Sequence, residues 1–145
     1  MRRMFVLSRR QRGQSMTELA LALALLVLML FGTVDFARIW NIQQVLDNAA
    51  RTGARYAALP AEGSQTLPTT ADVTTVVDNL LDSAGLTSGV TLTLNQAAAL
   101  NYGVVSATGS QLDLSYTYSL VTPGLAQIVP TVTLAGHATM RNETN

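Results

Sequence analysis

An uninterrupted apolar run near the N-terminus constrains the fold of this chain most. No residue from Leu19 to Phe31 is polar, and leucine and alanine, both strong helix formers, supply most of the run. Continued to Val34, it measures roughly 24 Å as a helix, which is slightly short of a bilayer core of about 30 Å. Extension back through Met16 and forward through Trp40 gives a sufficient length. We therefore expect a membrane-spanning helix.

Arginines precede this run and set its expected orientation. The basic leader contains Arg2, Arg3, Arg9, Arg10 and Arg12. After the run, Asp35 and Arg38 roughly cancel, so the positive-inside rule predicts a cytoplasmic amino terminus and an exported remainder. A nucleic-acid-binding arm is the alternative for the leader. The formal net charge is zero and no basic face remains elsewhere, so we expect no nucleic-acid partner.

A cleaved secretory signal is the second interpretation of the same segment, since it also combines a basic leader with an apolar core. Its cleavage site should follow the apolar run as a pattern of small residues. The chain has FGTVDFARIWNIQQ there, with Asp35, Phe36 and Trp40 in place of small side chains. A retained anchor is therefore the preferred interpretation.

One carboxylate, Glu18, stands at the start of the apolar run. An ionised side chain costs up to about 3 kcal/mol at the bilayer centre and less near its surface, so such a residue is a functional candidate. If the chain is cut between Gly13 and Gln14, Glu18 becomes the fifth residue of the product, behind a new terminal ammonium group. Glu18 of one copy could then neutralise that ammonium in a neighbour, which removes two desolvation penalties together. Gly13 also suits a protease, because glycine lets the backbone approach an active site closely.

In this segment the chain resembles a prepilin, with the basic leader, Gly13, a polar stretch, Glu18 and an apolar helix in family order. More narrowly, residues 9–58 are similar to the TadE family of pilin-like proteins from tight-adherence (Tad) pilus systems. That family has a glycine, a nearby glutamate, an apolar helix, and a helix end like NAARTGARYA at 48–57. The tail at 113–143 is similar to the family's closing strands. The chain departs from the family where many relatives carry a proline in the middle of the run.

The resemblance implies a TadE-like minor pilin or assembly component of a Tad-type type IV pilus involved in adherence, rather than the much shorter major subunit. Its implied partners are the membrane, a prepilin peptidase, other pilins and Tad assembly proteins. Gly13 and Gln14 are the expected processing site, and Gln14 and Glu18 the expected assembly and charge-pairing residues. The expected location is the bacterial inner membrane, single-pass, with incorporation into a pilus left open. The alternative is a permanently inserted envelope protein that binds a periplasmic partner without joining a filament.

The helix is expected to continue past the membrane. Apolar residues recur every three or four positions, as expected for one face of a helix, at Phe36, Ile39, Ile42, Leu46, Ala49, Gly53 and Tyr56. Gly53 weakens a helix by about 1 kcal/mol relative to alanine, which hints at close approach by another element, with a merely tolerated glycine as the alternative. Pro60 should end the helix. The chain then divides into a cytoplasmic basic leader (1–13), a long helix that spans the membrane in its first half (14–59), and an exported α+β domain (60–145).

A short amphipathic helix is expected in ADVTTVVDNLLDSAGL, capped by Thr69 or Thr70 and stopped by Gly85. Its aspartates, Asp72, Asp78 and Asp82, could be imagined as a cation site. They lack the glycine-bearing loop of a calcium motif, so a solvated helix face is the preferred interpretation. The resemblance leaves residues 62–110 unassigned.

Beyond Gly89 the apolar period changes to two, which predicts strands. Clear alternation occurs at 90–95, 111–119 and 131–136, with a weaker strand at 102–107, a turn at Gly109 and Ser110, and a loop or single helical turn at 122–130. The predicted fold is α+β and pilin-like. A long helix covers a three- to four-stranded antiparallel sheet, with one short extra helix.

Catalysis finds little support in the sequence. His137 is the only histidine and cysteine is absent, so we expect no thiolate metal site, no disulfide, no cofactor and no small-molecule substrate. No nucleophile elbow or phosphate-binding glycine motif is present, so the expectation is a protein that is not an enzyme, with a small exported hydrolase as the remote alternative. Tyr116 and Tyr118 share a strand face and could serve adhesion, but core aromatics are the preferred interpretation.

Overall fold

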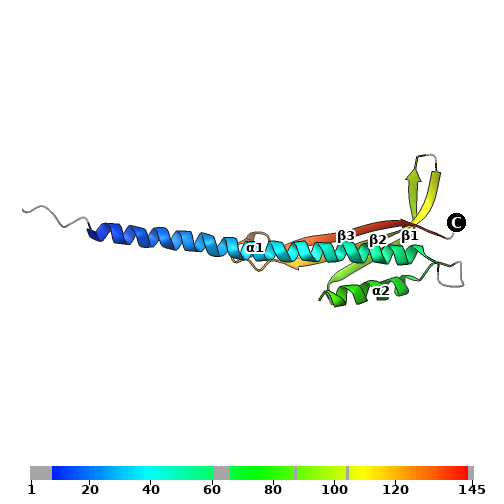
Figure 1. The fold of residues 1–145 in the computed structure, drawn as a ribbon, viewed down its shortest axis with the longest axis horizontal. Helices are drawn as coiled ribbons and strands as arrows, with labels where there is room; N and C mark the ends of the chain where they lie inside the picture. The colour runs from blue at the N-terminus through cyan, green and yellow to red at the C-terminus, as the bar shows by residue number, and fades with distance from the viewer. Residues whose placement is uncertain (1–7, 61–65, 87, 104, 144–145) are drawn as a thin grey trace, which may run out of the picture.

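The computed structural model describes residues 8–60, 66–86, 88–103 and 105–143. Along the chain it contains α1 (Ser8–Ala58), α2 (Thr70–Ser83), β1 (Val90–Tyr102), β2 (Val105–Ser119), α3 (Leu125–Ile128) and β3 (Thr131–Arg141). The first half of α1 projects as a free rod, and the other elements gather along its second half (Figure 1). The expected α+β architecture is confirmed.

The two halves of α1 differ in burial. Leu25, in the projecting half, is 69% exposed, whereas Leu46, in the docked half, is fully buried. Within the described residues, α1 is the one helix long and apolar enough to cross a membrane, and only 6% of its most apolar window is buried. A face this apolar without a protein cover indicates contact with something other than water. The predicted long apolar helix is confirmed, and by its length and composition it is a candidate membrane span.

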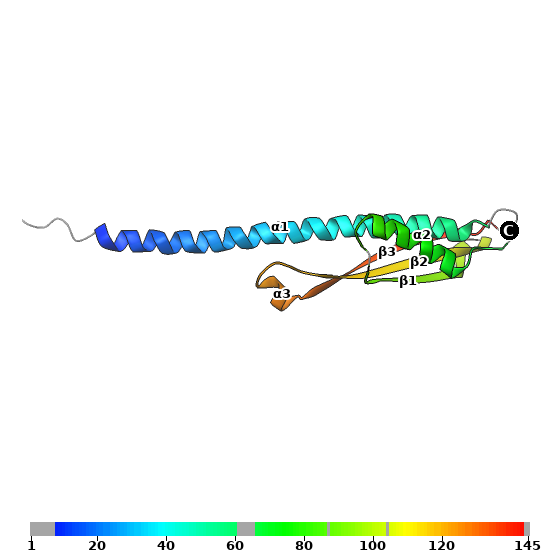
Figure 2. The ribbon, with the colours of Figure 1, turned by 90° about the horizontal axis from the view of Figure 1, so that it is seen from below.

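The sheet has three strands within the described residues, in the order β1-β2-β3, and both pairs are antiparallel. Its apolar residues alternate along the strands, so Leu112 and Leu114 on β2 and Leu134 on β3 face the helices. Both α1 and α2 lie over this one face (Figure 2). Partly buried residues of β1, such as Leu92, pack against a core that α1, α2, β2 and β3 supply. The core residues are Leu46, Ala49, Ala50, Ala54, Ala57, Val73, Val77, Leu81, Leu112, Leu114, Tyr118, Leu134 and Ala138.

The α2 helix begins with the predicted cap. The Thr69 hydroxyl accepts from the Asp72 backbone N–H at 3.3 Å, and the Asp72 carboxylate accepts from the Thr69 N–H at 3.0 Å. This reciprocal arrangement is a capping box, which satisfies backbone donors that a helix start leaves open. The Thr69 hydroxyl also donates to the Asp72 carboxylate at 2.7 Å, and this bond together with the one from the Thr69 N–H lowers the pKa of Asp72. Gly85, at φ 81°, ends the helix as expected.

The predicted turn at Gly109 and Ser110 is wrong, and so is a separate strand at 102–107. The chain instead turns at Gly103, where φ is 69°, and β1 and β2 form one long hairpin whose end rises away from the sheet (Figure 1). Gly109 pairs with Ala98 inside the hairpin, and a Cβ there would lie 2.6 Å from the Met140 carbonyl oxygen. Gly109 is therefore required by close packing, although glycine followed by serine is also a common turn signal.

The end of α1 is held by the tail of the chain. The Glu143 N–H donates to the Ala58 carbonyl at 3.0 Å, and the buried Ser110 hydroxyl donates to the Ala57 carbonyl at 3.2 Å. The single hydroxyl proton of Ser110 is shared between this carbonyl and the Asn142 side-chain oxygen, which lies 2.8 Å from the hydroxyl oxygen. The last carbonyls of a helix lack partners within it, so these contacts satisfy the end of α1 just before Pro60.

Two glycines allow close approach between layers. A Cβ at Gly53 would lie 2.5 Å from a Leu112 methyl and 2.6 Å from a Val77 methyl. A Cβ at Gly136 on β3 would lie 2.6 Å from the Leu46 carbonyl oxygen. The close approach predicted at Gly53 is confirmed, and Gly136 marks where β3 crosses directly over α1.

Candidate functional site

The predicted processing and assembly residues lie on the projecting half of α1. Gln14 and Glu18 are one turn apart, and the Gln14 side-chain amide donates to the Glu18 carboxylate at 3.2 Å. The Thr17 hydroxyl donates back to the Gln14 carbonyl at 2.8 Å. Both side chains of the predicted pair are exposed. The hydrogen-bond partner of the Glu18 carboxylate is therefore a neutral amide. Its negative charge can still pair with a positive group of another molecule.

Gly13 lies inside α1, because the helix begins at Ser8 and continues through it. Nothing lies within 4 Å of the position that a Cβ on Gly13 would take. The Gly13–Gln14 peptide bond thus sits on an open helix surface, but in a helical backbone that a protease would have to unwind locally. Glycine weakens a helix by about 1 kcal/mol relative to alanine, so Gly13 eases that unwinding.

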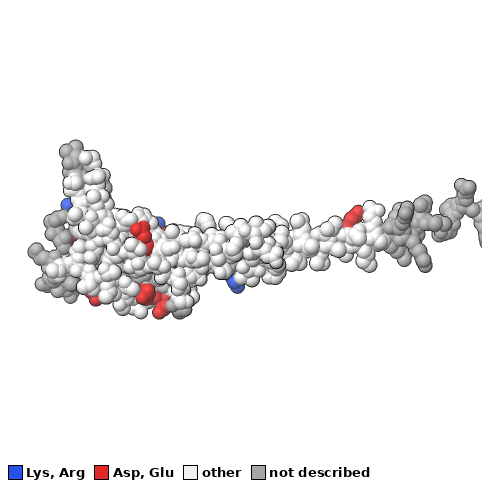
Figure 3. Space-filling model, turned by 180° about the vertical axis from the view of Figure 1, so that it is seen from behind, with Lys and Arg blue, Asp and Glu red and all other residues white. Residues whose placement is uncertain are grey.

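Between Glu18 and Asp35 the rod carries no charged residue. Its large side chains are open to the surroundings, with Leu21 at 74%, Met29 at 73% and Leu30 at 60% exposure. Figure 3 shows this uncoloured stretch along the rod, between charged atoms near its free end and others where it meets the folded domain. The arrangement suits a lipid environment or apolar helices of other subunits.

At the C-terminal end of this run, Asp35 is buried, with 3% of its surface exposed. Its carboxylate accepts from the Tyr118 hydroxyl at 2.9 Å, the Val121 N–H at 3.1 Å, and the Thr122 N–H at 2.8 Å. The Thr122 hydroxyl adds a further bond of 2.5 Å. The carboxylate therefore fastens the segment after β2 to the middle of α1.

This role of Asp35 was not predicted from the sequence. From the sequence, Asp35 counted as a charge that offsets Arg38 and as a residue that does not fit a signal cleavage site, without any role in the fold. The signal was the position of an acid directly after a long apolar run, where an unpartnered carboxylate is unfavourable. Its partners follow more than eighty residues later, and local spacing does not reveal such a pairing.

The tyrosines of β2 belong to the core. Tyr118 is 8% exposed and donates to Asp35, while Tyr116 is partly buried and packs against the core cluster. Contact with Asp35 and burial both raise the pKa of Tyr118, with burial the larger cause. The preferred interpretation as core aromatics is confirmed.

His137 lies on the sheet face opposite the helices, beside Asp113. Its Nδ1 is 2.5 Å from an Asp113 carboxylate oxygen, and its Nε2 is 3.3 Å from the Thr139 hydroxyl. The order carboxylate, imidazole, hydroxyl is the order of groups in a Ser-His-Asp catalytic triad. The side chains of His137 and Asp113 are 59% and 45% exposed, however, so the face is open to water. Such a site lacks the enclosure that strengthens catalytic electrostatics. That the chain is not an enzyme stays a prediction.

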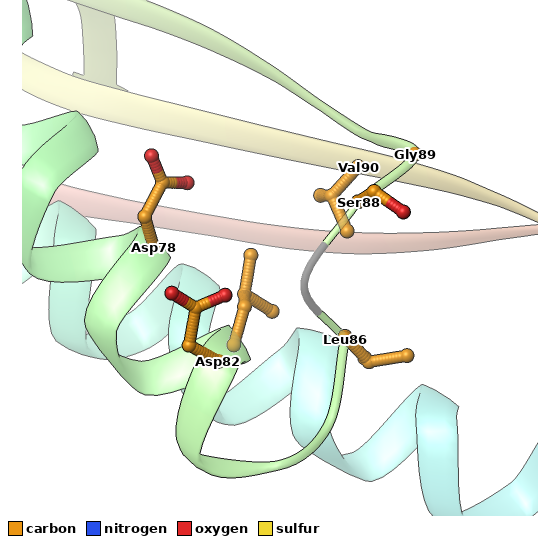
Figure 4. Close-up of a pocket in the computed structure, with 7 residues that line it drawn as sticks. Asp78, Asp82, Leu86, Ser88, Gly89 and Val90 are labelled. Atoms are coloured by element: carbon orange, nitrogen blue, oxygen red, sulfur yellow. The ribbon is translucent and has the colours of Figure 1, made fainter.

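The aspartates of α2 border a shallow pocket. Asp78 and Asp82 lie at its edge with Ser88 and Val90, and the pocket has a volume of about 160 Å³ (Figure 4). In Figure 4 both carboxylates lie on the same side of α2. Asp72 is at the opposite end of α2, in the capping box. Among the described residues, no group of three or more histidine, aspartate or glutamate side chains could hold a metal ion.

These observations define a class of protein. A long helix leaves an apolar half uncovered, and its other half forms the spine of a small α+β domain. This is an α+β architecture built on one long helix, whose uncovered half is a candidate membrane span.

Residues 13–55 match the model of the family described as TadE-like protein. The match confirms the TadE-like resemblance over the projecting helix and most of its docked half, including Gly13 and Glu18. The family suggests a protein associated with the Tad pilus and with the membrane. The resemblance of the tail at 113–143 lies outside the matched residues and stays a prediction. No curated protein and no solved structure compared with the chain matches it.

Proposed function

We propose that this chain is a membrane-anchored minor pilin, or assembly component, of a Tad-type pilus that serves adherence. One observation carries the proposal. An exposed carboxylate, Glu18, lies five places beyond Gly13 at the start of an uncovered apolar rod, within a segment that matches the TadE-like family. A rod of this kind needs apolar neighbours, and a carboxylate among them needs a positive partner.

Processing supplies that partner. A prepilin peptidase removes residues 1–13 by cutting the bond between Gly13 and Gln14, which creates an ammonium group on Gln14. The exposed Glu18 of one copy then pairs with the ammonium of its neighbour. Within one chain, Glu18 accepts a hydrogen bond of 3.2 Å from the neutral Gln14 amide. The ammonium of a neighbouring copy can replace this amide as the partner of Glu18. Pairing of two full charges away from water favours the stacked arrangement over isolated helices, since each group alone would be unsatisfied there.

The proposed topology follows from the charges. The basic leader stays in the cytoplasm, the first half of α1 crosses the inner membrane, and the α+β domain is exported. Partners are the membrane, the prepilin peptidase, other pilins and Tad assembly proteins. No nucleic acid, cofactor, metal or small-molecule substrate is part of this function.

The test replaces Glu18 with glutamine, which keeps the size of the side chain and one acceptor oxygen but removes its charge. We expect Glu18→Gln to lower the amount of this protein in sheared pili at least tenfold, while the membrane fraction keeps it. The control is Asp78→Asn, which removes an exposed acid from the domain and should leave the pilus fraction unchanged. Normal processing together with normal recovery in pili would overturn the proposal. Amino-terminal sequencing that starts at Met1 in cells with the peptidase would overturn the cleavage step.

The second candidate is a permanently inserted envelope protein that binds a periplasmic partner. The continuity of α1 from Ser8 through Gly13 favours it, because no break exposes the cleavage site. Fractionation separates the two functions, since this candidate stays with the membrane when pili are sheared off. A third, the exported hydrolase, is tested by His137→Ala, which should leave pilus formation and adherence unchanged.

A further inference from the structure

The segment between β2 and β3 is unusually apolar for an exposed loop. Leu120 to Pro130 contains no charged residue. Val121 is 57% exposed, Ile128 80% and Val129 44%. Adjacent apolar side chains with this exposure indicate a surface that meets an apolar partner. We call residues 121–129 the apolar loop.

The apolar loop is held at a defined level along α1. Its neck is closed by the Leu120 N–H, which donates to the Pro130 carbonyl at 3.2 Å. The Val121 and Thr122 N–H groups are bound to Asp35, the first residue after the apolar run. Figure 2 shows α3, within this loop, beyond the ends of the strands and beside the middle of α1. The loop therefore lies where the uncovered rod meets the domain.

The surface of α1 at this level has the character of a membrane boundary. Phe36 and Trp40 are 65% and 59% exposed, and their rings stack with centroids 6.2 Å apart. Tryptophan concentrates at the boundary between hydrocarbon and water. The run from Leu19 to Val34 alone is roughly 24 Å long, against a hydrocarbon core of about 30 Å. The boundary should accordingly fall beyond Asp35, close to Trp40.

Asp35 would then lie at membrane depth, where an open carboxylate is unfavourable. The loop satisfies this carboxylate with hydroxyl and N–H groups, while its Val121, Ile128 and Val129 side chains are exposed. We propose that the apolar loop inserts into the outer surface of the lipid bilayer as a second membrane contact, and that Asp35 is the residue that positions it. A lipid surface is favoured over a second copy of the chain because the loop is continuous with the membrane-spanning surface of α1. The inference rests on the proposed membrane insertion of α1.

The chain has no cysteine, so a single introduced cysteine can carry a nitroxide spin label. The full chain is reconstituted in vesicles of phosphatidylcholine and phosphatidylglycerol in equal amounts. Three variants are compared: Ile128→Cys in the apolar loop, Leu25→Cys as the lipid reference on the rod, and Ser106→Cys as the water reference on the β1–β2 hairpin. Power saturation measures the accessibility of each label to oxygen, which prefers lipid, and to a nickel chelate, which prefers water.

We expect the label at 128 to resemble that at 25, with oxygen accessibility severalfold above that of the nickel chelate. Adding Asp35→Ala should raise nickel accessibility at 128 severalfold and leave the label at 25 unchanged. Asp35→Asn, which keeps an acceptor oxygen for the Thr122 and Val121 N–H groups, should give a smaller rise and serves if the alanine variant does not fold.

Each contrary outcome is distinct. A label at 128 that matches the one at 106, or that shows dipolar broadening from a second copy, overturns the inference while membrane anchoring stands. A label at 25 that is exposed to water overturns both membrane anchoring and the inference. A label at 128 that stays in lipid after either change at Asp35 overturns the assignment of Asp35 as the positioning residue.

Discussion

At the scale of single residues, Asp35 joins two parts of the chain that the sequence does not connect. Its carboxylate is the acceptor for a tyrosine hydroxyl, a threonine hydroxyl and two backbone N–H groups. Thr122 is 1% exposed, so its donors have no access to water in place of Asp35. The contact therefore fixes both the loop and the point where the domain begins along the helix.

A change at Tyr118 measures how much its hydrogen bond to Asp35 stabilises the folded state, with little change in side-chain shape. Tyr118→Phe removes one hydroxyl from a buried position, and we expect it to lower the free energy of unfolding in detergent micelles by about 1–2 kcal/mol. Tyr116→Phe is the matched control, since Tyr116 is only partly buried on the same strand, and it should change stability by less than about 0.5 kcal/mol. Equal effects of the two changes, measured by thermal unfolding, would show that the hydroxyl bond to Asp35 contributes little.

Asp113 gives the outer sheet face a weak pH dependence. The hydrogen bond from His137 lowers the pKa of Asp113 below its ordinary value. A lowered pKa in the folded state means that this stabilisation is present above the unfolded pKa of about 3.9 and is lost as pH falls through the folded value. We expect wild type to exceed Asp113→Asn in stability by no more than about 1 kcal/mol, because both partners are exposed. Urea unfolding from pH 6 to pH 3 should show the two proteins converging below about pH 4. A difference that persists unchanged at pH 3 would contradict the prediction.

At the scale of elements, the crossing of β3 over α1 depends on Gly136. Gly136→Ala places a methyl group 2.6 Å from the Leu46 carbonyl oxygen. Backbone cannot move aside as a side-chain tip can, so the two layers must separate, and we expect a loss of about 2–3 kcal/mol. Ala135→Ser, at the neighbouring exposed position, is the control and should be nearly neutral. Thermal unfolding measures both. A stability of Gly136→Ala within the range of the control would show that the layers adjust freely.

Elements with a strong local pattern were predictable from the sequence. The long helix up to Pro60, the Thr69 cap, and the alternating strands all follow from rules that act over a few residues. The end of the first hairpin was not predictable, because Gly109 is set by packing against Met140 and Leu100 and not by a turn. The candidate site divides in the same way. The spacing of Gly13 and Glu18 can be recognised within a few residues of sequence, whereas the hydrogen-bond partners of Asp35 come from a distant part of the chain.

At the scale of the whole molecule, the helix has two environments and the domain covers only one. From Leu46 to Ala58 most apolar residues of α1 are buried, with Tyr56 as the exception, whereas those of the N-terminal half are exposed. Asp35 and the apolar loop lie at the change between them. If the uncovered half crosses a membrane as proposed, the orientation of α1 decides on which side the domain folds.

The basic leader should set that orientation. Changing Arg9, Arg10 and Arg12 to glutamine removes most of the positive charge beside the apolar run, so the preference for a cytoplasmic amino terminus weakens. In a Ser106→Cys background, we expect labelling by a membrane-impermeant maleimide in intact spheroplasts to fall severalfold. The control changes Arg51 and Arg55 to glutamine, which removes the same kind of charge from exposed positions on the docked half of α1, and labelling should stay at the wild-type level. If labelling survives loss of the leader charges but falls in the control, orientation is set by the folded domain and not by the leader.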